Sequence, residues 1–141
     1  MNVYIDTSVL TAYYSPESRS QRVQAFLLDI PRPAVSWLTE TEIASAMARK
    51  VRDGSLPRAQ AVEIWSLFHS HLAEGAFWRL PVVLEHYELA SGWIGAFNLP
   101  LRTLDALHLA VAVSERLPLA TLDRGLAKAG RTIGAKIIEI E

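Results

Sequence analysis

Four acidic residues stand at points where the chain changes from one expected element to the next. Asp6 directly follows a short apolar run, and Asp123 comes shortly after another. Glu42 and Asp105 lie where two helices are expected to begin. Carboxylates gathered in one crevice repel each other, and some stay protonated unless a cation compensates their charge. Mg²⁺ and Mn²⁺ prefer oxygen donors and can activate water to hydrolyse a phosphodiester, so these residues predict a divalent-cation site.

Each of these acids also has a structural explanation, which the sequence leaves open. Asp6 and Asp123 are suited to cap the helices that follow them. Glu42 stands three residues after Thr39, as in a capping box. Asp105 is harder to explain in this way because it interrupts an almost continuous apolar run, although a capping role is open for it too. Four acids at element junctions therefore favour a common site more strongly than any one of them.

The elements that must position these acids are short strands alternating with helices. Short apolar runs predict strands, and apolar residues at helical spacing predict helices. The alternation predicts an α/β fold whose parallel sheet is covered by helices on both faces, and ligands bind such sheets outside the carboxyl ends of the strands. The expected strands cover residues 2–5, 34–37, 77–80, 117–121 and 136–140. The expected helices cover residues 9–14, 17–29, 40–53, 58–73, 83–97, 103–115 and 124–130.

The chain has 141 residues, which suits one domain over residues 1–141. Half of the residues are hydrophobic, which argues against disorder. The absence of cysteine excludes a disulfide scaffold and a cysteine metal site, and it suits a reducing cytosol. The sequence shows neither the basic and apolar regions of a signal peptide nor an apolar stretch long enough to span a membrane, so we expect a cytoplasmic location and no membrane partner.

The formal net charge of −1 offers no global attraction for a nucleic acid, so a contact with RNA must come from a local basic patch. The sequence has two basic clusters, and most such clusters are only solvated faces. The second lies near Asp123, where it is suitably placed to meet a phosphate backbone. The first cluster is Arg49, Lys50 and Arg52, and the second is Arg124, Lys128 and Arg131.

The histidines and tryptophans give weaker signals. His69 and His71 are two residues apart and would lie on different faces of a helix, which makes them a poor metal pair. His108 lies one turn after Asp105 and could face the site, but we favour hydrogen bonds within the helix layer. The four tryptophans could stack on RNA bases, yet nothing in the sequence separates that role from one in the core or in an interface.

Four segments of the sequence carry a family resemblance. They are VYIDTSVL (3–10), VSWLTETEIASAMARK (35–50), LRTLDALHLAVA (101–112) and LATLDRGLAKAG (119–130). In this order and spacing they resemble the PIN-domain ribonucleases, and most closely the VapC-type toxins of toxin–antitoxin pairs. The resemblance implies a PIN-like three-layer α/β/α sandwich with a parallel five-stranded sheet. It also implies a Mg²⁺- or Mn²⁺-dependent endoribonuclease, usually a homodimer, that a cognate antitoxin holds inactive.

The resemblance assigns catalytic, metal-binding roles to all four acids and supporting roles to two hydroxyl side chains. At the second acid position the family's glutamate is followed by an apolar residue, which favours Glu42 over Glu40. The implied metal ligands are Asp6, Glu42, Asp105 and Asp123, supported by Ser8 and Thr121.

Other functions remain compatible with the sequence. The same enzyme could serve RNA processing or repair, although the compact length favours a toxin. A catalytically inactive PIN fold could bind RNA or protein, but the presence of all four acids argues against it. An Asp-nucleophile phosphatase would want a second Asp where Ser8 stands. The surface for an antitoxin is expected on the helices within 8–28 and 39–73, whose large apolar side chains are Tyr13, Tyr14, Phe26, Trp65 and Phe68.

Overall fold

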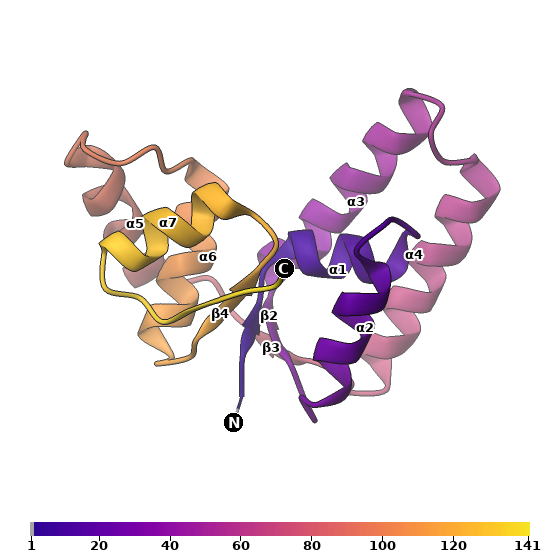
Figure 1. Ribbon diagram of the computed structural model, residues 1–141, viewed down its shortest axis with the longest axis horizontal. Coiled ribbons are helices and arrows are strands. Elements are labelled where there is room, and N and C mark those ends of the chain that lie inside the picture. The colour runs from indigo at the N-terminus through magenta and orange to yellow at the C-terminus, as the bar shows by residue number, and fades with distance from the viewer. Residues whose placement is uncertain (1) are drawn as a thin grey trace.

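The computed structural model describes residues 2–141 and contains a five-stranded sheet in which all neighbouring strands are parallel (Figure 1). The strand order is β3-β2-β1-β4-β5, so the first strand of the chain lies at the centre. The chain therefore extends the sheet in one direction through β2 and β3, and in the other through β4 and β5. The strands are β1 (Tyr4–Ile5), β2 (Ala34–Ser36), β3 (Trp78–Leu80), β4 (Leu119–Thr121) and β5 (Ile137–Glu139).

Seven helices join these strands within the described residues. None of these helices is both long and apolar enough to cross a membrane. The helices are α1 (Thr7–Tyr14), α2 (Ser20–Leu28), α3 (Trp37–Arg52), α4 (Arg58–Ala73), α5 (Leu84–Gly95), α6 (Thr103–Ser114) and α7 (Arg124–Thr132).

The helices form two layers, one on each face of the sheet. Successive residues of a strand point to opposite faces. Ile5 accordingly packs into a core built with α1 to α4, whereas its neighbour Tyr4 packs into a second core built with α5 to α7. Figure 1 shows these two groups of helices on opposite sides of the strands. Burial of both strand faces is what a parallel sheet requires, and the predicted three-layer α/β/α architecture is confirmed.

The start of α3 differs from the prediction. The helix begins at Trp37 rather than at residue 40, directly after the last residue of β2. The Ser36 backbone N–H donates a hydrogen bond to Thr39 Oγ1 at 3.2 Å, so the capping box is formed by Ser36 and Thr39. The predicted capping box of Thr39 and Glu42 is therefore wrong, because Glu42 lies in the second turn. Capping no longer explains why a glutamate stands there.

Candidate active site

Asp6 lies at the carboxyl end of the central strand and is 95% buried, with 5% of its surface exposed. It stands at the N-cap position of α1, but its side chain makes no capping hydrogen bond. Instead, Oδ2 accepts hydrogen bonds from Ser8 Oγ at 2.6 Å and from Thr121 Oγ1 at 2.9 Å. The alternative of Asp6 as a helix cap therefore finds no support in its side-chain contacts.

The two hydroxyl groups also connect the start of α1 to the end of β4. Ser8 Oγ accepts a hydrogen bond from the Leu122 backbone N–H at 3.2 Å, and Thr121 Oγ1 accepts one from the Asp123 backbone N–H at 2.9 Å. Because each hydroxyl both donates to Asp6 and accepts from the β4–α7 loop, the pair fixes the Asp6 carboxylate relative to Asp123. The family resemblance implies supporting roles for Ser8 and Thr121, and these contacts place both hydroxyls beside Asp6.

Asp105 and Asp123 approach Asp6 from the starts of α6 and α7. Burial raises the pKa of the Asp105 carboxyl, and the charges of Asp6 and Asp123 add to this rise, which Arg102 only partly offsets. Repulsion of this kind requires that the three aspartates lie near one another. Asp123 also caps α7, because Oδ1 accepts a hydrogen bond from the Leu126 backbone N–H at 3.0 Å. Asp123 thus combines the structural role that the sequence left open with a place at the site.

Glu42 reaches the same region from α3. Its Oε1 accepts a hydrogen bond from Thr7 Oγ1 at 2.8 Å and forms a short contact with His108 Nε2. Burial alone would raise the pKa of Glu42, but the hydrogen bond and the charge of His108, together with the Thr7 hydrogen bond, lower it below its ordinary value. Glu42 is therefore ionised and held in place from two sides.

His108 is the residue that the sequence interpretation undervalued. It is fully buried, and its contacts lie outside its own helix layer: Nδ1 meets the Tyr4 hydroxyl at 2.6 Å, and Nε2 meets Glu42. The Tyr4 hydroxyl donates to Ser36 Oγ at 2.9 Å, so its oxygen is left to accept from Nδ1. A carboxylate only accepts, so Nε2 carries a proton as well, and this arrangement favours the cationic form of the ring.

The pKa of His108 agrees with this assignment. Burial alone would lower it, but the interaction with Tyr4, the hydrogen bond to Glu42 and the charges of two nearby carboxylates raise it well above its ordinary value. The contacts of His108 join α6 to β1 and α3, so they could not be predicted from the sequence around it. The sequence offered only one indication of its role, which was its position one turn after Asp105.

Glu40 points away from this region. Its carboxylate forms an ion pair with Arg79 of β3, and its Oε1 lies 3.4 Å from His69 Nε2. The guanidinium of Arg79 also covers the ring of Trp37, 3.7 Å from its centroid. Glu40 thus ties α3 to β3 and α4, whereas Glu42, two residues later, faces the other acids.

All four predicted acids line one cavity of about 420 Å³ outside the carboxyl ends of β1 and β4. Ser8, Arg49 and Arg102 line it as well, whereas Glu40 does not. As the side chains stand in residues 2–141, no three histidine or acidic groups converge tightly enough to form a metal site. The donor set nevertheless fits a hard divalent cation, because it consists of carboxylate oxygens, and the raised pKa of Asp105 marks negative charge that a cation would balance.

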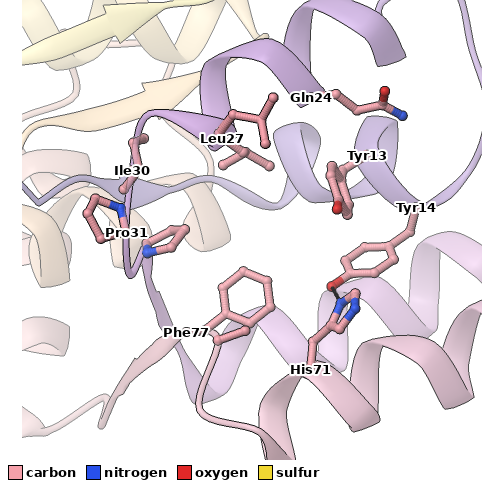
Figure 2. Close-up of a pocket in the computed structure, with 11 residues that line it drawn as sticks. Tyr13, Tyr14, Gln24, Leu27, Ile30, Pro31, His71 and Phe77 are labelled. Atoms are coloured by element: carbon pink, nitrogen blue, oxygen red, sulfur yellow. Dashed lines mark hydrogen bonds between the residues drawn. The ribbon is translucent and has the colours of Figure 1, made fainter.

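A second cavity, of about 220 Å³, has a different character. It lies between α1, α2 and the end of α4. Figure 2 shows Tyr14 and His71 side by side among its lining residues, with the Tyr14 hydroxyl 2.6 Å from His71 Nδ1. Burial raises the pKa of the Tyr14 hydroxyl, and the neighbouring Tyr13 adds to this rise. No acidic residue lines this cavity, so it offers no cation site comparable to the first.

Comparison with known proteins identifies the fold family. A model of the PIN domain matches residues 3–132. The chain is similar in structure to FitAcB from Neisseria gonorrhoeae, with a TM-score of 0.69, 19% identity and coverage of 99% of this chain and 97% of the other. It is similar to VapBC2 from Rickettsia felis, crystallised with a fragment of promoter DNA, with a TM-score of 0.72, 14% identity and complete coverage of both chains.

A third similar structure is VapC20 from Mycobacterium tuberculosis, described as a toxin that cleaves the sarcin–ricin loop. Its TM-score is 0.70 at 16% identity, with coverage of 91% of this chain and 95% of the other. A search of curated proteins gave no significant match. Because the family model spans nearly all of the chain and the fold matches VapC-type structures over its length, the chain belongs to the PIN domain family.

Proposed function

We propose that this PIN-domain protein is a divalent-cation-dependent endoribonuclease and the toxin of a toxin–antitoxin pair that acts in the cytoplasm. The observation that carries the proposal is the meeting of Asp6, Asp105 and Asp123 at the carboxyl edge of the sheet, where the charges of Asp6 and Asp123 help to raise the pKa of Asp105. Three segments far apart in sequence supply these carboxylates. A purely structural role would not require charges of one sign to be gathered in this way.

In this proposal some residues of the cavity bind the cation and others position the binding residues. Asp6, Asp105 and Asp123 would hold Mg²⁺ or Mn²⁺, and Glu42 faces the same cavity from α3. Such an ion, when bound, supplies an activated water and stabilises the leaving oxygen of a phosphodiester. Ser8 and Thr121 orient the Asp6 carboxylate by donating hydrogen bonds to a single oxygen, Oδ2. His108 holds Glu42 from inside the fold, so Glu42 is positioned before substrate arrives.

The surface for an antitoxin is best matched by a groove between α3 and α4. It has a volume of about 440 Å³, and Met47, Val51, Val62 and Trp65 are among the side chains that line it. An amphipathic helix of the antitoxin would lay its apolar face there. Of the side chains that the sequence nominated, Trp65 lines this groove, whereas Phe68 and Tyr14 are buried in the core. A toxin–antitoxin complex from Klebsiella pneumoniae is also similar in structure to this chain, which supports a partner of this class.

A homodimer is proposed on the opposite layer. Leu84 and Tyr87 of α5, and Phe97 after α5, are large hydrophobic side chains that remain exposed. Large apolar patches that remain exposed on a monomer often form interfaces with other protein chains.

Cleavage of RNA by the purified protein tests the proposal. We expect cleavage with Mg²⁺ or Mn²⁺, none in excess EDTA, and recovery when the metal is restored. Asp6→Asn, purified in parallel, is the control for contaminating nuclease and should be inactive. Cleavage that persists in EDTA or in Asp6→Asn would remove the basis for the proposed mechanism.

Expression in a host cell tests the toxin role separately. The chain alone should arrest growth, and Asp105→Asn should be harmless. An active nuclease that leaves growth unaffected when folded and abundant would favour RNA processing over a toxin.

A further inference from the structure

The cavity that holds the four acids contains two basic side chains, Arg49 and Arg102. Their presence needs an explanation, because a cluster of carboxylates repels a phosphate backbone and the net charge of −1 offers no general attraction. His108 balances Glu42 from inside the fold, and one bound divalent cation would compensate only part of the negative charge of the three aspartates. RNA that enters the cavity therefore requires cations of the protein beside the scissile phosphate.

Arg102 lies at the aspartate side of the cavity. It occupies the N-cap position of α6, and its side chain is 80% exposed. Its Nη2 lies 3.4 Å from Asp105 Oδ2 and 3.8 Å from Asp123 Oδ2. Both distances exceed the 2.7–2.9 Å that is usual for a charge-assisted hydrogen bond. The guanidinium therefore balances two acids loosely and is free to move when a cation takes its place between them.

Arg49 lines the cavity from α3, which packs on the opposite face of the sheet from α6. Glu42, Ser45, Ala46 and Arg49 all line the cavity, and their spacing of three, four and seven residues places them on one face of the helix. Arg49 stands two turns beyond Glu42 and is exposed. Among residues 2–141, no carboxylate lies within ion-pair distance of Arg49, so its guanidinium is available to bind a phosphate.

We propose that Arg49 and Arg102 are substrate-binding residues that hold RNA phosphates on opposite sides of the acidic cavity. The inference rests on the proposed ribonuclease function and specifies how its substrate is held. A guanidinium binds a phosphate through two parallel hydrogen bonds, which fixes orientation as well as charge. Arg102 would exchange partners, leaving Asp105 and Asp123 when these bind the cation and turning to a phosphate.

Salt-dependent RNA binding tests this assignment with a readout that a structural role would not change. The probe is a fluorescein-labelled single-stranded RNA of mixed sequence, and all variants carry Asp6→Asn so that cleavage does not compete with binding. Each single-strand phosphate contact contributes about 0.7 to the slope of log Kd against log salt concentration. We expect Arg49→Gln and Arg102→Gln each to reduce that slope by about 0.7 and to weaken binding roughly 5- to 10-fold at low salt.

Two further variants sharpen the comparison. Arg32→Gln removes an exposed arginine before β2, at the opposite edge of the sheet, and should leave the slope unchanged. Arg102→Lys keeps the charge without the paired hydrogen bonds, so it should retain the slope while raising KM for cleavage in the otherwise wild-type protein. Titration with Mn²⁺ alone, in proteins that keep Asp6, should show that Arg102→Gln binds the ion at least as tightly as the wild-type protein, because a competing cation has been removed.

The outcomes separate this inference from the function on which it rests. If the wild-type protein cleaves RNA but both arginine variants keep the parental salt slope, the inference is wrong and the function stands. Weaker Mn²⁺ binding in Arg102→Gln would show that Arg102 organises the acids, which also overturns its substrate role. If the wild-type protein neither cleaves nor binds RNA, the proposed function fails first and takes the inference with it.

Discussion

Replacing His108 with glutamine probes how the fold holds Glu42 at the site. The imidazole is fully buried between Tyr4 and Glu42, and a glutamine of similar length keeps hydrogen-bonding capacity but loses the positive charge. Breaking a fully buried ion pair costs about 3–5 kcal/mol. Glu42 keeps 20% of its side chain exposed to the cavity, so water screens part of the loss, and we expect about 2–3 kcal/mol. For a chain of this size the melting temperature should fall by about 6–10 °C.

A double-mutant cycle measured by urea unfolding isolates the pair from other effects of each substitution. Glu42→Gln alone should cost about 1–2 kcal/mol, because His108 can lose its proton once its partner is neutral. The double variant should then lose about 1–2 kcal/mol less than the sum of the two single variants. His69→Gln is the matched control, since His69 pairs with Glu40 at 3.4 Å while 41% exposed, and it should cost under about 1 kcal/mol.

The pH dependence of the coupling follows from the two pKa shifts in the metal-free protein. The pKa of His108 is raised in the folded state, so its stabilisation is complete below the unfolded value of about 6.5 and is lost as pH rises through the folded value. The pKa of Glu42 is lowered, so its stabilisation is present above the unfolded value of 4.5 and is lost as pH falls through the folded value. Coupling should therefore be largest near pH 5–6.5. Additive effects of the two substitutions in that range, to within about 0.5 kcal/mol, would refute the ion pair.

Three more predictions use the same crevice and its supporting packing. In an RNA-cleavage assay Glu42→Gln should abolish turnover, while Glu40→Gln, whose parent side chain faces β3 and α4, should retain most of it; the reverse result would show that the second acid was misplaced. Asp105→Asn should raise the melting temperature of the metal-free protein at neutral pH, because burial and neighbouring acids raise the pKa of Asp105, and this gain should vanish below the unfolded pKa of 3.8. Gly130→Ala should lower the free energy of unfolding by about 1–3 kcal/mol, since a Cβ there would lie 2.6 Å from a β5 side chain; Gly92→Ala, with open space in α5, should instead stabilise by about 0.5–1 kcal/mol.

Much of the fold could be read from the sequence because its local patterns agree with its tertiary structure. Short apolar runs became the five strands, and the acids at element junctions came to line one cavity. The α3 boundary was missed because the apolar AVSW segment resembles a strand through Trp37, although Ser36 followed by Thr39 was an available capping signal. Local patterns predict where each strand ends and each helix begins. These boundaries were sufficient to place Asp6 and Asp105 at the edge of the sheet.

The contacts of His108 and Arg102 could not be read in the same way. The contacts of His108 depend on how α6 packs against β1 and α3. The pattern of one segment does not predict which side chains of another segment it will meet. Arg102 stands three residues before Asp105, a spacing that predicts a local ion pair. Its second contact, with Asp123, depends on the tertiary fold, because β4 ends at the same edge of the sheet and α7 starts there.

The sheet order explains why this edge is where chemistry is expected. From the central strand the chain proceeds to β2 on one side and later to β4 on the other, so the connections after β1 and β4 diverge and leave a crevice between them. Asp6 and Thr121 stand at the ends of these two strands and are joined by a hydrogen bond across 115 positions of sequence. That contact forms only after the sheet has assembled, so it cannot serve the local stability of either segment. The Asp6 carboxylate is buried beside two others, is held by hydroxyls from α1 and β4, and makes no capping hydrogen bond. Its most direct explanation is the binding of a cation.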